Sequence, residues 1–390
     1  MAGSAVEAMD NKLRNVLSAG LLPPFWAVVL LPLTAFASAL YAAVMRLRNL
    51  AYDRGWKASR SFDLPVICIG NLSVGGTGKT PHVEHVVNLL TSRGLKVAVL
   101  SRGYGRATRG FREADPAVSR AEEVGDEPLQ ISKNCTAATV AVCEDRCHGI
   151  EKILSLHPET EVIVLDDAFQ HRRVRAGMNV LLTTAQRPFS SDFVMPLGRL
   201  REPRSGAVRA DAVVVTKCLN EAERNLHIPL RNGVPLFHSS VSYNAFRPLL
   251  ERIGDSVRTK PIFRGPGSRG GVLLVTGIAD PSPLVRFIRE CTTGSVRNVA
   301  FPDHHVFTAS DGERIRKNFE ELKREGEASI LVTQKDAQRL LSTDIGIGDL
   351  LPQTDVVCIG LEIENEKGKK SFDQTIIDYV DQNKRDRRVD

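Results

Sequence analysis

The chain has 390 residues, of which 42% are hydrophobic and 25% are charged, with a formal net charge of +6. This composition is typical of a globular protein with more than one domain, and it excludes a disordered chain. The positive surplus favours an anionic ligand or an anionic membrane surface, whereas aromatic residues are few (6%), so no nucleic-acid partner is expected.

The N-terminal segment is the first distinctive feature of the chain. Residues 15–45 hold no charged side chain, and residues 21–33 are strongly apolar. A helix from Pro24 to Met45 would reach the roughly 30 Å of a hydrocarbon core, with a kink expected at Pro32. We therefore expect this segment to attach the chain to a membrane. Whether it spans the bilayer, lies on its surface or packs as a helical hairpin of a soluble protein stays open.

The charges around this segment predict its orientation. Basic residues are few before it and numerous after it: Lys12 and Arg14 precede it, and it is followed by Arg46, Arg48, Arg54, Lys57 and Arg60. The excess of positive charge predicts that everything after residue 45 stays in the cytoplasm. Seven scattered cysteines likewise indicate a reducing compartment.

A glycine-rich loop at residues 73–80 follows an apolar run at 65–70 and precedes a helix-like segment at 81–90. Strand, glycine loop and helix is the order of a phosphate-binding loop, in which Lys79 reaches the β- and γ-phosphates and Thr80 can hold Mg²⁺. The usual spacing would place a glycine at residue 73. We expect the whole loop to contact the nucleotide: Ser73, Val74, Gly75, Gly76, Thr77, Gly78, Lys79 and Thr80.

Polar residues follow the next predicted strand, at 95–100. Arg102 and Tyr104 come directly after it and are expected at the same sheet edge as Lys79, because ligands bind at the carboxyl ends of parallel strands. Arginine suits forked hydrogen bonds to phosphate, although a capping or solvated arginine is the alternative. Asp126 opens a later helical stretch, a position that the helix dipole alone explains.

A second acidic cluster ends the strand predicted at residues 161–165. One carboxylate of the pair Asp166 and Asp167 is expected to hold magnesium, with helix capping as the alternative. Gln170 and His171 follow at once and indicate the mouth of an acceptor site. In the proline-bounded loop at 195–203, a ligand role and a structural role are equally open for its polar residues, Arg201 and Glu202.

Turn residues then multiply, and a second βα alternation begins at residue 271. Its strands, at 271–277, 296–301 and 329–333, again end in polar clusters, one of which holds His304 and His305. For His304 a helix cap or a surface position is the ordinary alternative to catalysis. The chain thus predicts an α/β fold with a helical N-terminal segment (1–60), a phosphate-loop domain (61–217), a linker (218–270) and a second parallel α/β domain (271–390).

Six motifs together resemble the tetraacyldisaccharide 4′-kinase family of lipid A synthesis. They lie at residues 73–81, 101–105, 125–128, 166–171, 200–203 and 301–305. The resemblance implies two α/β/α domains joined by a short strand linker, and a membrane-associated N-terminal helix. It also implies transfer of the γ-phosphate of ATP, with Mg²⁺, to the 4′-hydroxyl of a lipid A disaccharide 1-phosphate at the cytoplasmic face of the inner membrane. No obligate protein partner is expected.

The resemblance also assigns roles to residues. Asp126 and His304 resemble the family's catalytic pair, in which a histidine oriented by a carboxylate takes the proton of the sugar hydroxyl once the two domains close. Whether His304 or His305 acts stays open. Ala168 departs from the glycine that many members carry. The predicted set comprises catalytic Asp126, His304 and Lys79, metal-binding Thr80, Asp167 and Glu202, and substrate-binding Arg102, Tyr104, Gln170, His171 and Arg201.

Three other classes of protein are alternatives to this family. A dimerising regulatory ATPase is disfavoured because Val74 stands where such proteins place a lysine before the glycines. A GTP-binding switch is suggested by Lys217 but lacks an aspartate at residue 219, which is leucine. An inactive scaffold would not be expected to keep Lys79, Asp126, Asp167 and His304 together.

Overall fold

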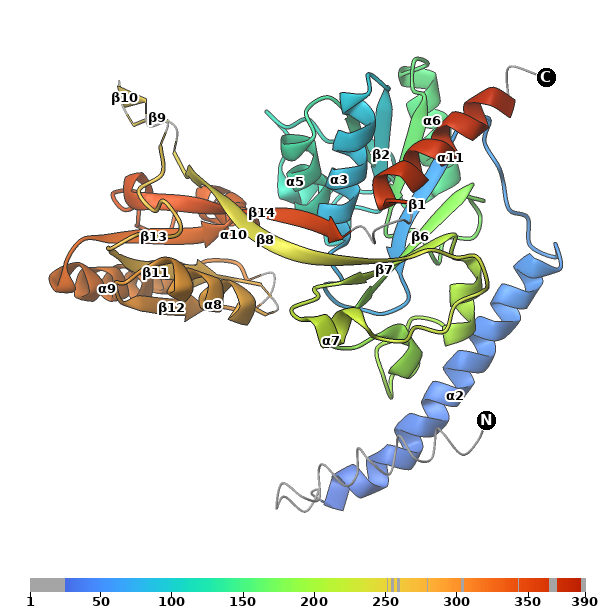
Figure 1. Ribbon diagram of the computed structural model, residues 1–390, viewed down its shortest axis with the longest axis horizontal. Helices are drawn as coiled ribbons and strands as arrows, with labels where there is room; N and C mark the ends of the chain where they lie inside the picture. Colours follow the sequence, from blue (N-terminus) through green and yellow to red (C-terminus); the bar gives the residue numbers. More distant parts are fainter. Residues whose placement is uncertain are drawn as a thin grey trace.

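The computed structural model describes residues 25–250, 252–253, 256–257, 260–278, 280–302, 305–342, 344–364 and 370–386. Two lobes are joined by a pair of long strands, and a long helix extends beyond the first lobe (Figure 1). The expected α/β class is confirmed. The two lobes share one 12-stranded sheet, in the order β12-β11-β13-β14-β8-β7-β6-β1-β5-β2-β4-β3.

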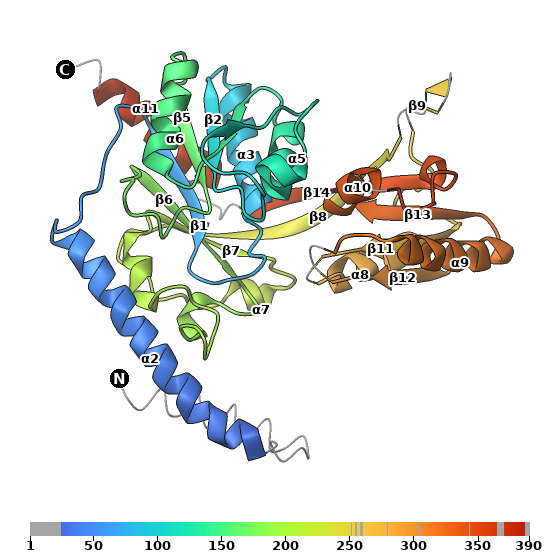
Figure 2. The same cartoon turned by 180° about the vertical axis from the view of Figure 1, so that it is seen from behind.

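The first lobe is a parallel sheet covered on both faces. Its strands are β1 (Val66–Asn71), β2 (Val97–Ser101), β4 (Thr139–Val142), β5 (Val162–Asp166), β6 (Met178–Thr184) and β7 (Ala212–Thr216), with β3 (Arg112–Glu113) antiparallel at the edge. They read as continuous apolar runs because helices cover both faces. Side chains of α3 (Lys79–Ser92) and α5 (Asp126–Asn134) pack on one face, and those of α6 (Arg146–Leu156) on the other. Figure 2 shows the arrangement from behind.

The second lobe repeats the βα alternation. Its parallel strands are β11 (Gly271–Thr276), β12 (Val296–Ala300) and β13 (Ala328–Thr333), and its helices are α8 (Ser282–Cys291), α9 (Ala309–Glu325) and α10 (Gln334–Ser342). The long strands β8 (Leu236–Pro248) and β14 (Thr354–Glu364) pair antiparallel and carry the sheet from one lobe to the other. Short elements complete the described chain: α4 (Ala121–Val124), α7 (Glu221–Arg224), β9 (Arg252–Ile253), β10 (Ser256–Val257) and the 3₁₀ turns Phe189–Ser191, Arg204–Arg209 and Leu351–Gln353.

The last helix, α11 (Phe372–Asp386), returns to the first lobe. Phe372, Ile376 and Val380 are fully buried in the core that also holds Val87 of α3. The final part of the segment predicted as the second domain therefore packs on the phosphate-loop domain. The predicted domain boundaries are otherwise untested.

The N-terminal helix α2 runs from Phe25 to Asp53 with Pro32 inside it, so it is longer than expected at its C-terminal end. Its inward face is held by polar contacts: Ser38 Oγ donates to the Val194 carbonyl at 2.6 Å, and the Tyr41 hydroxyl to the Arg201 carbonyl at 2.9 Å. Among the described residues, no helix combines the length and the apolar character that crossing a bilayer requires.

Candidate active site

The phosphate-binding loop lies where the sequence predicted it, between β1 and α3. Gly75 and Gly78 have φ values of 108° and 79°, a conformation that favours glycine. Asn71 Nδ2 donates to Thr77 Oγ1 at 2.7 Å, and Thr216 Oγ1 donates to the Thr77 carbonyl at 2.9 Å. The loop is therefore held on both sides by the ends of buried strands.

The first turn of this loop explains the missing glycine. Ser73 forms an isolated antiparallel bridge with Leu200, and the Val74 N–H donates to the Arg199 carbonyl at 2.8 Å. The chain enters the loop in a strand-like conformation, which any residue adopts, so no glycine is needed at residue 73.

Lys79 opens α3 and is buried. Its Nζ lies 3.7 Å from Asp167 Oδ2, and Arg201 Nη1 donates to both oxygens of Asp167 at 2.9 and 3.0 Å. Asp167 has a φ of 49°, unusual for a residue other than glycine, which turns its side chain toward these cations. The structure thus brings together three residues that the sequence predicted for the site.

Asp166 is a candidate that the predicted ligand set omitted. Its side chain is fully buried, its Oδ2 accepts from Ser101 Oγ at 2.9 Å, and its Oδ1 has no hydrogen-bond partner among the described residues. Burial, followed by the negative charges of Glu127 and Asp167, raises the pKa of Asp166 to about 7. A divalent cation would satisfy the open oxygen and offset this cost. The signal in the sequence was its place as the last residue of a buried strand.

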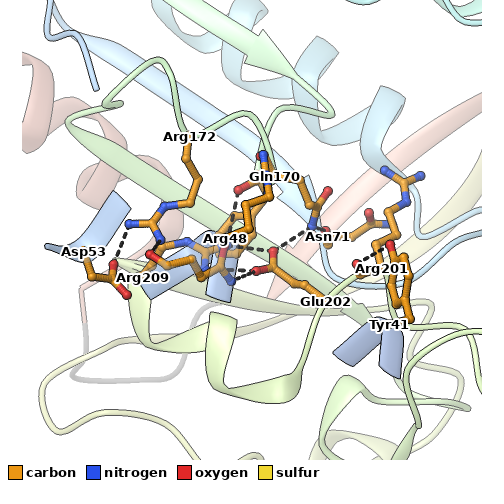
Figure 3. A network of polar contacts seen from close by, with 11 residues as sticks. Tyr41, Arg48, Asp53, Asn71, Gln170, Arg172, Arg201, Glu202 and Arg209 are labelled. Carbon is orange, nitrogen blue, oxygen red and sulfur yellow. Dashed lines mark hydrogen bonds and ion pairs between the residues drawn. The ribbon is translucent and has the colours of Figure 1, made fainter. Parts of the chain in front are cut away.

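Glu202 does not fit the predicted role of a metal ligand. It is fully buried, and both of its carboxylate oxygens are already hydrogen-bonded (Figure 3). Oε1 accepts from Arg209 Nη2 at 2.7 Å and Gln170 Nε2 at 3.0 Å, and Oε2 accepts from Asn49 Nδ2 at 2.7 Å and Arg209 Nη1 at 3.1 Å. Protein donors therefore take the positions that a metal would need, and Glu202 ties α2 to the first lobe.

The remaining predicted substrate residues differ in exposure. Arg102 and Tyr104 are exposed on the loop after β2, and Tyr104 keeps 84% of its surface accessible. Gln170 donates from Nε2 to the Asn71 carbonyl at 2.8 Å. His171 is partly buried, and burial together with Arg146 lowers its pKa to about 4, so its ring is neutral near pH 7. Their contact with a substrate stays a prediction.

Lys217 was missed as a site residue. It follows β7 with a φ of 60°, and its Nζ lies 3.9 Å from the point that a Cβ on Gly76 would occupy. Burial lowers its pKa, although Asp280 acts in the opposite direction. A second lysine thus stands beside the phosphate-binding loop. Only its position at a strand end hinted at this in the sequence.

One member of the predicted catalytic pair, Asp126, lies where the two lobes meet. Asp126 is the first residue of α5, and its Oδ2 accepts from Arg339 Nη2 of the second lobe at 2.8 Å. His304 lies outside the described residues, so its assignment is not tested. His305 hydrogen-bonds through Nε2 to Asp311 Oδ2 at 2.9 Å in the first turn of α9 and stacks on Phe301. These contacts give His305 a structural role at the start of that helix.

Comparison with known proteins gives a consistent result. A family model described as tetraacyldisaccharide-1-P 4′-kinase matches residues 26–380. The chain is 43% identical to the tetraacyldisaccharide 4′-kinase of Bacteroides fragilis over 363 residues, which cover 90% of this chain and 93% of that protein. Its identity to the protein of the same name from Bacteroides thetaiotaomicron is 42%, covering 89% and 92% of the two chains.

A solved structure is also similar over most of the chain. The crystal structure of LpxK from Aquifex aeolicus in complex with ATP matches with a TM-score of 0.67 and 28% sequence identity. The match covers 90% of this chain and 98% of the other. The similarity therefore includes both lobes and the strands that join them.

Proposed function

The chain belongs to the tetraacyldisaccharide-1-P 4′-kinase family, and from this premise we propose that it transfers the γ-phosphate of ATP to the 4′-hydroxyl of a tetraacyldisaccharide 1-phosphate. The protein is thus an ATP-dependent kinase of lipid A biosynthesis. The observation that carries this proposal is the phosphate-binding loop facing Asp167, with Asp126 at the junction of the lobes. Neither the described residues nor the similar proteins favour a regulatory ATPase.

The phosphate-binding loop and its cations bind the nucleotide. The glycine-rich backbone directs N–H groups at the β- and γ-phosphates, and the buried Lys79 ammonium spreads the charge that develops on the transferred group. Arg201 holds Asp167 in the conformation that faces Lys79. These residues orient the triphosphate and exclude water from it.

Magnesium is proposed as the metal. When bound, Mg²⁺ would neutralise negative charge on the phosphates. Thr80, with its hydroxyl at the start of α3, and Asp166, with its open buried oxygen, have the oxygen ligands that this ion prefers. Asp167 contacts two cations already, so we place it as their counter-charge and as an indirect neighbour of the metal.

Asp126 is proposed to act on the acceptor. The 4′-hydroxyl loses its proton to the pair formed by Asp126 and His304 as its oxygen bonds to the γ-phosphorus, while the bond from that phosphorus to ADP breaks. Arg102, Tyr104, Gln170 and His171 are proposed to contact the acceptor. Because Asp126 and His304 come from different lobes, the reaction requires the lobes to be together.

Attachment to the cytoplasmic face of the inner membrane is proposed from the outward face of α2. Exposed apolar side chains recur along it at helical spacing: Leu33, Phe36, Leu40, Val44 and Leu47. We call this set the apolar stripe. A helix that is anchored by polar contacts on one side and apolar on its exposed side suits a lipid surface. The basic residues after it suit anionic headgroups.

The direct test is a transfer assay. The assay mixes purified protein with Mg²⁺, γ-labelled ATP and tetraacyldisaccharide 1-phosphate. Labelled lipid should form with no other protein added, since no obligate partner is proposed. Lys79→Ala is the control and should give none. Label found only in inorganic phosphate, at the same rate with and without the lipid, would favour the regulatory ATPase instead.

A further inference from the structure

The lobes meet through polar side chains of α5 and α10. Besides the Asp126–Arg339 ion pair at 2.8 Å, Gln334 Nε2 donates to Asn134 Oδ1 at 3.4 Å, and Lys133 Nζ donates to Gln338 Oε1. The ion pair is the part of this interface that includes a residue proposed to act in catalysis. The side chain of Arg339 is 11% exposed, and that of Asp126 is 26% exposed.

The Arg339 guanidinium is fixed from within its own lobe. Its Nη1 lies 3.5 Å from Asp336 Oδ1 and donates to the Gly277 carbonyl at 3.4 Å. Asp336 is itself fully buried, and its Oδ2 accepts from the Gly277 N–H at 3.0 Å and from Thr333 Oγ1 at 2.6 Å. The second lobe therefore presents the guanidinium in one orientation, toward α5.

Helix α5, which carries Asp126, is held by contacts within the first lobe. Glu84 of α3 accepts from Gln130 Nε2 at 3.0 Å and from Asn134 Nδ2 at 2.9 Å, both on α5. Helix α3 begins at Lys79, in the phosphate-binding loop. Polar contacts thus run from the nucleotide site through α3 and α5 to Arg339.

We propose that Arg339 is a positioning residue for phosphoryl transfer, which holds the Asp126 carboxylate in its working orientation only when the second lobe lies against α5. This inference rests on the proposed function. A planar, permanently charged guanidinium suits the task because it fixes direction as well as charge. A lysine at this position keeps the charge but loses the fixed geometry. A lysine variant therefore separates the effect of the charge from the effect of the geometry.

The competing explanation is a purely structural ion pair that keeps the lobes together. Such a role predicts changes in stability and in the affinity for ATP or lipid, with kcat unaffected once substrates are saturating. A positioning role predicts that the loss appears in kcat, because the contact matters when the acceptor proton is moved. The separation of kcat from KM therefore decides between the two.

The test uses the full chain with Arg339→Met and Arg339→Lys, and with Gln338→Ala as the matched control, because Gln338 also contacts α5 through Lys133. Arg339→Met should lower kcat about 10- to 100-fold, the range produced by loss of a charge-assisted hydrogen bond, and leave the KM for ATP within about twofold. Arg339→Lys should recover part of kcat, and Gln338→Ala should keep the wild-type value.

Three results would overturn the inference that Arg339 positions Asp126. If wild type is active and Asp126→Asn is inactive but Arg339→Met keeps kcat, Arg339 does not position Asp126, and the proposed function stands. An Arg339→Lys variant with no more kcat than Arg339→Met, when both show wild-type thermal melting, would also contradict it. If wild type labels no lipid, the proposed function and this inference fail together.

Discussion

Asn49 of α2 donates a hydrogen bond from Nδ2 to Oε2 of Glu202 at 2.7 Å. The carboxylate that receives it is fully buried and is also bound by Arg209 and Gln170. Glu202 thus connects α2, which carries the apolar stripe, to a buried charge network of the first lobe.

Removing that charge should destabilise the protein. Glu202→Ala leaves the Arg209 guanidinium without its buried partner and should lower the free energy of unfolding by about 3 kcal/mol, as for other broken buried pairs. Denaturant unfolding measures this. Asp349→Asn, which weakens an exposed pair with Arg316, should have a much smaller effect because solvent screens that pair. Equal losses in the two variants would show that the buried network does not hold the lobe.

The apolar stripe should drive membrane attachment. Phe36→Glu with Leu40→Glu replaces side chains that are 69% and 59% exposed, so folding should be little affected while lipid contact is lost. Flotation with anionic vesicles should fall at least about tenfold, and ATP binding should be unchanged. The matched control replaces two exposed apolar residues outside α2, Val118→Glu with Leu156→Glu. If both double variants float equally, α2 is not the attachment site.

Lys217 should contribute to nucleotide binding. Its ammonium lies beside Gly76 of the phosphate-binding loop, so Lys217→Met should weaken ATP binding about tenfold through loss of one charged contact. Isothermal titration with ATP and Mg²⁺ measures the dissociation constant. Lys335→Met, a lysine of the second lobe, serves as the control for lost positive charge. An unchanged dissociation constant for Lys217→Met would remove this residue from the site.

The free energy of unfolding should fall at acidic pH, and His82 should cause part of this fall. Its Nδ1 donates to the Gly78 carbonyl at 2.7 Å, and burial lowers its pKa from 6.5 to about 4. Between these values the unfolded chain binds a proton that the folded chain does not, so the free energy of unfolding falls as the pH is lowered from 6.5 toward 4.

The comparison with His82→Gln isolates this contribution. Denaturant unfolding at about pH 7 and about pH 5 should show a smaller acid loss in the variant than in wild type. The loss should not vanish, because burial also lowers the pKa of His171. The same acid loss in both proteins would mean that His82 does not remain neutral in the folded state.

Local patterns predicted the fold and part of the site. The apolar runs became buried parallel strands, and the polar residues after them met at one sheet edge because parallel strands end on the same side. This rule was enough to bring Lys79 and Asp167 together. It says nothing about partners on distant elements, which explains the residues that were misjudged or missed.

Glu202 illustrates the limit. Its loop looked like a ligand-binding segment, but its contacts with Asn49 and Arg209 depend on how α2 docks, which no local pattern encodes. Arg339 sits mid-helix in α10 with no motif around it, and only the meeting of the lobes places it against Asp126. The return of α11 to the first lobe has the same origin, since its apolar face fits either lobe by sequence alone.

The most direct test of the account is the chemical position of the transferred phosphate. The lipid product of wild type should carry its new phosphate on the 4′-oxygen, as read by phosphorus–proton NMR, and Asp126→Asn should form no product while its dissociation constant for ATP stays within about twofold of wild type. Phosphate on another oxygen of the sugar, or full activity of Asp126→Asn, would contradict the account.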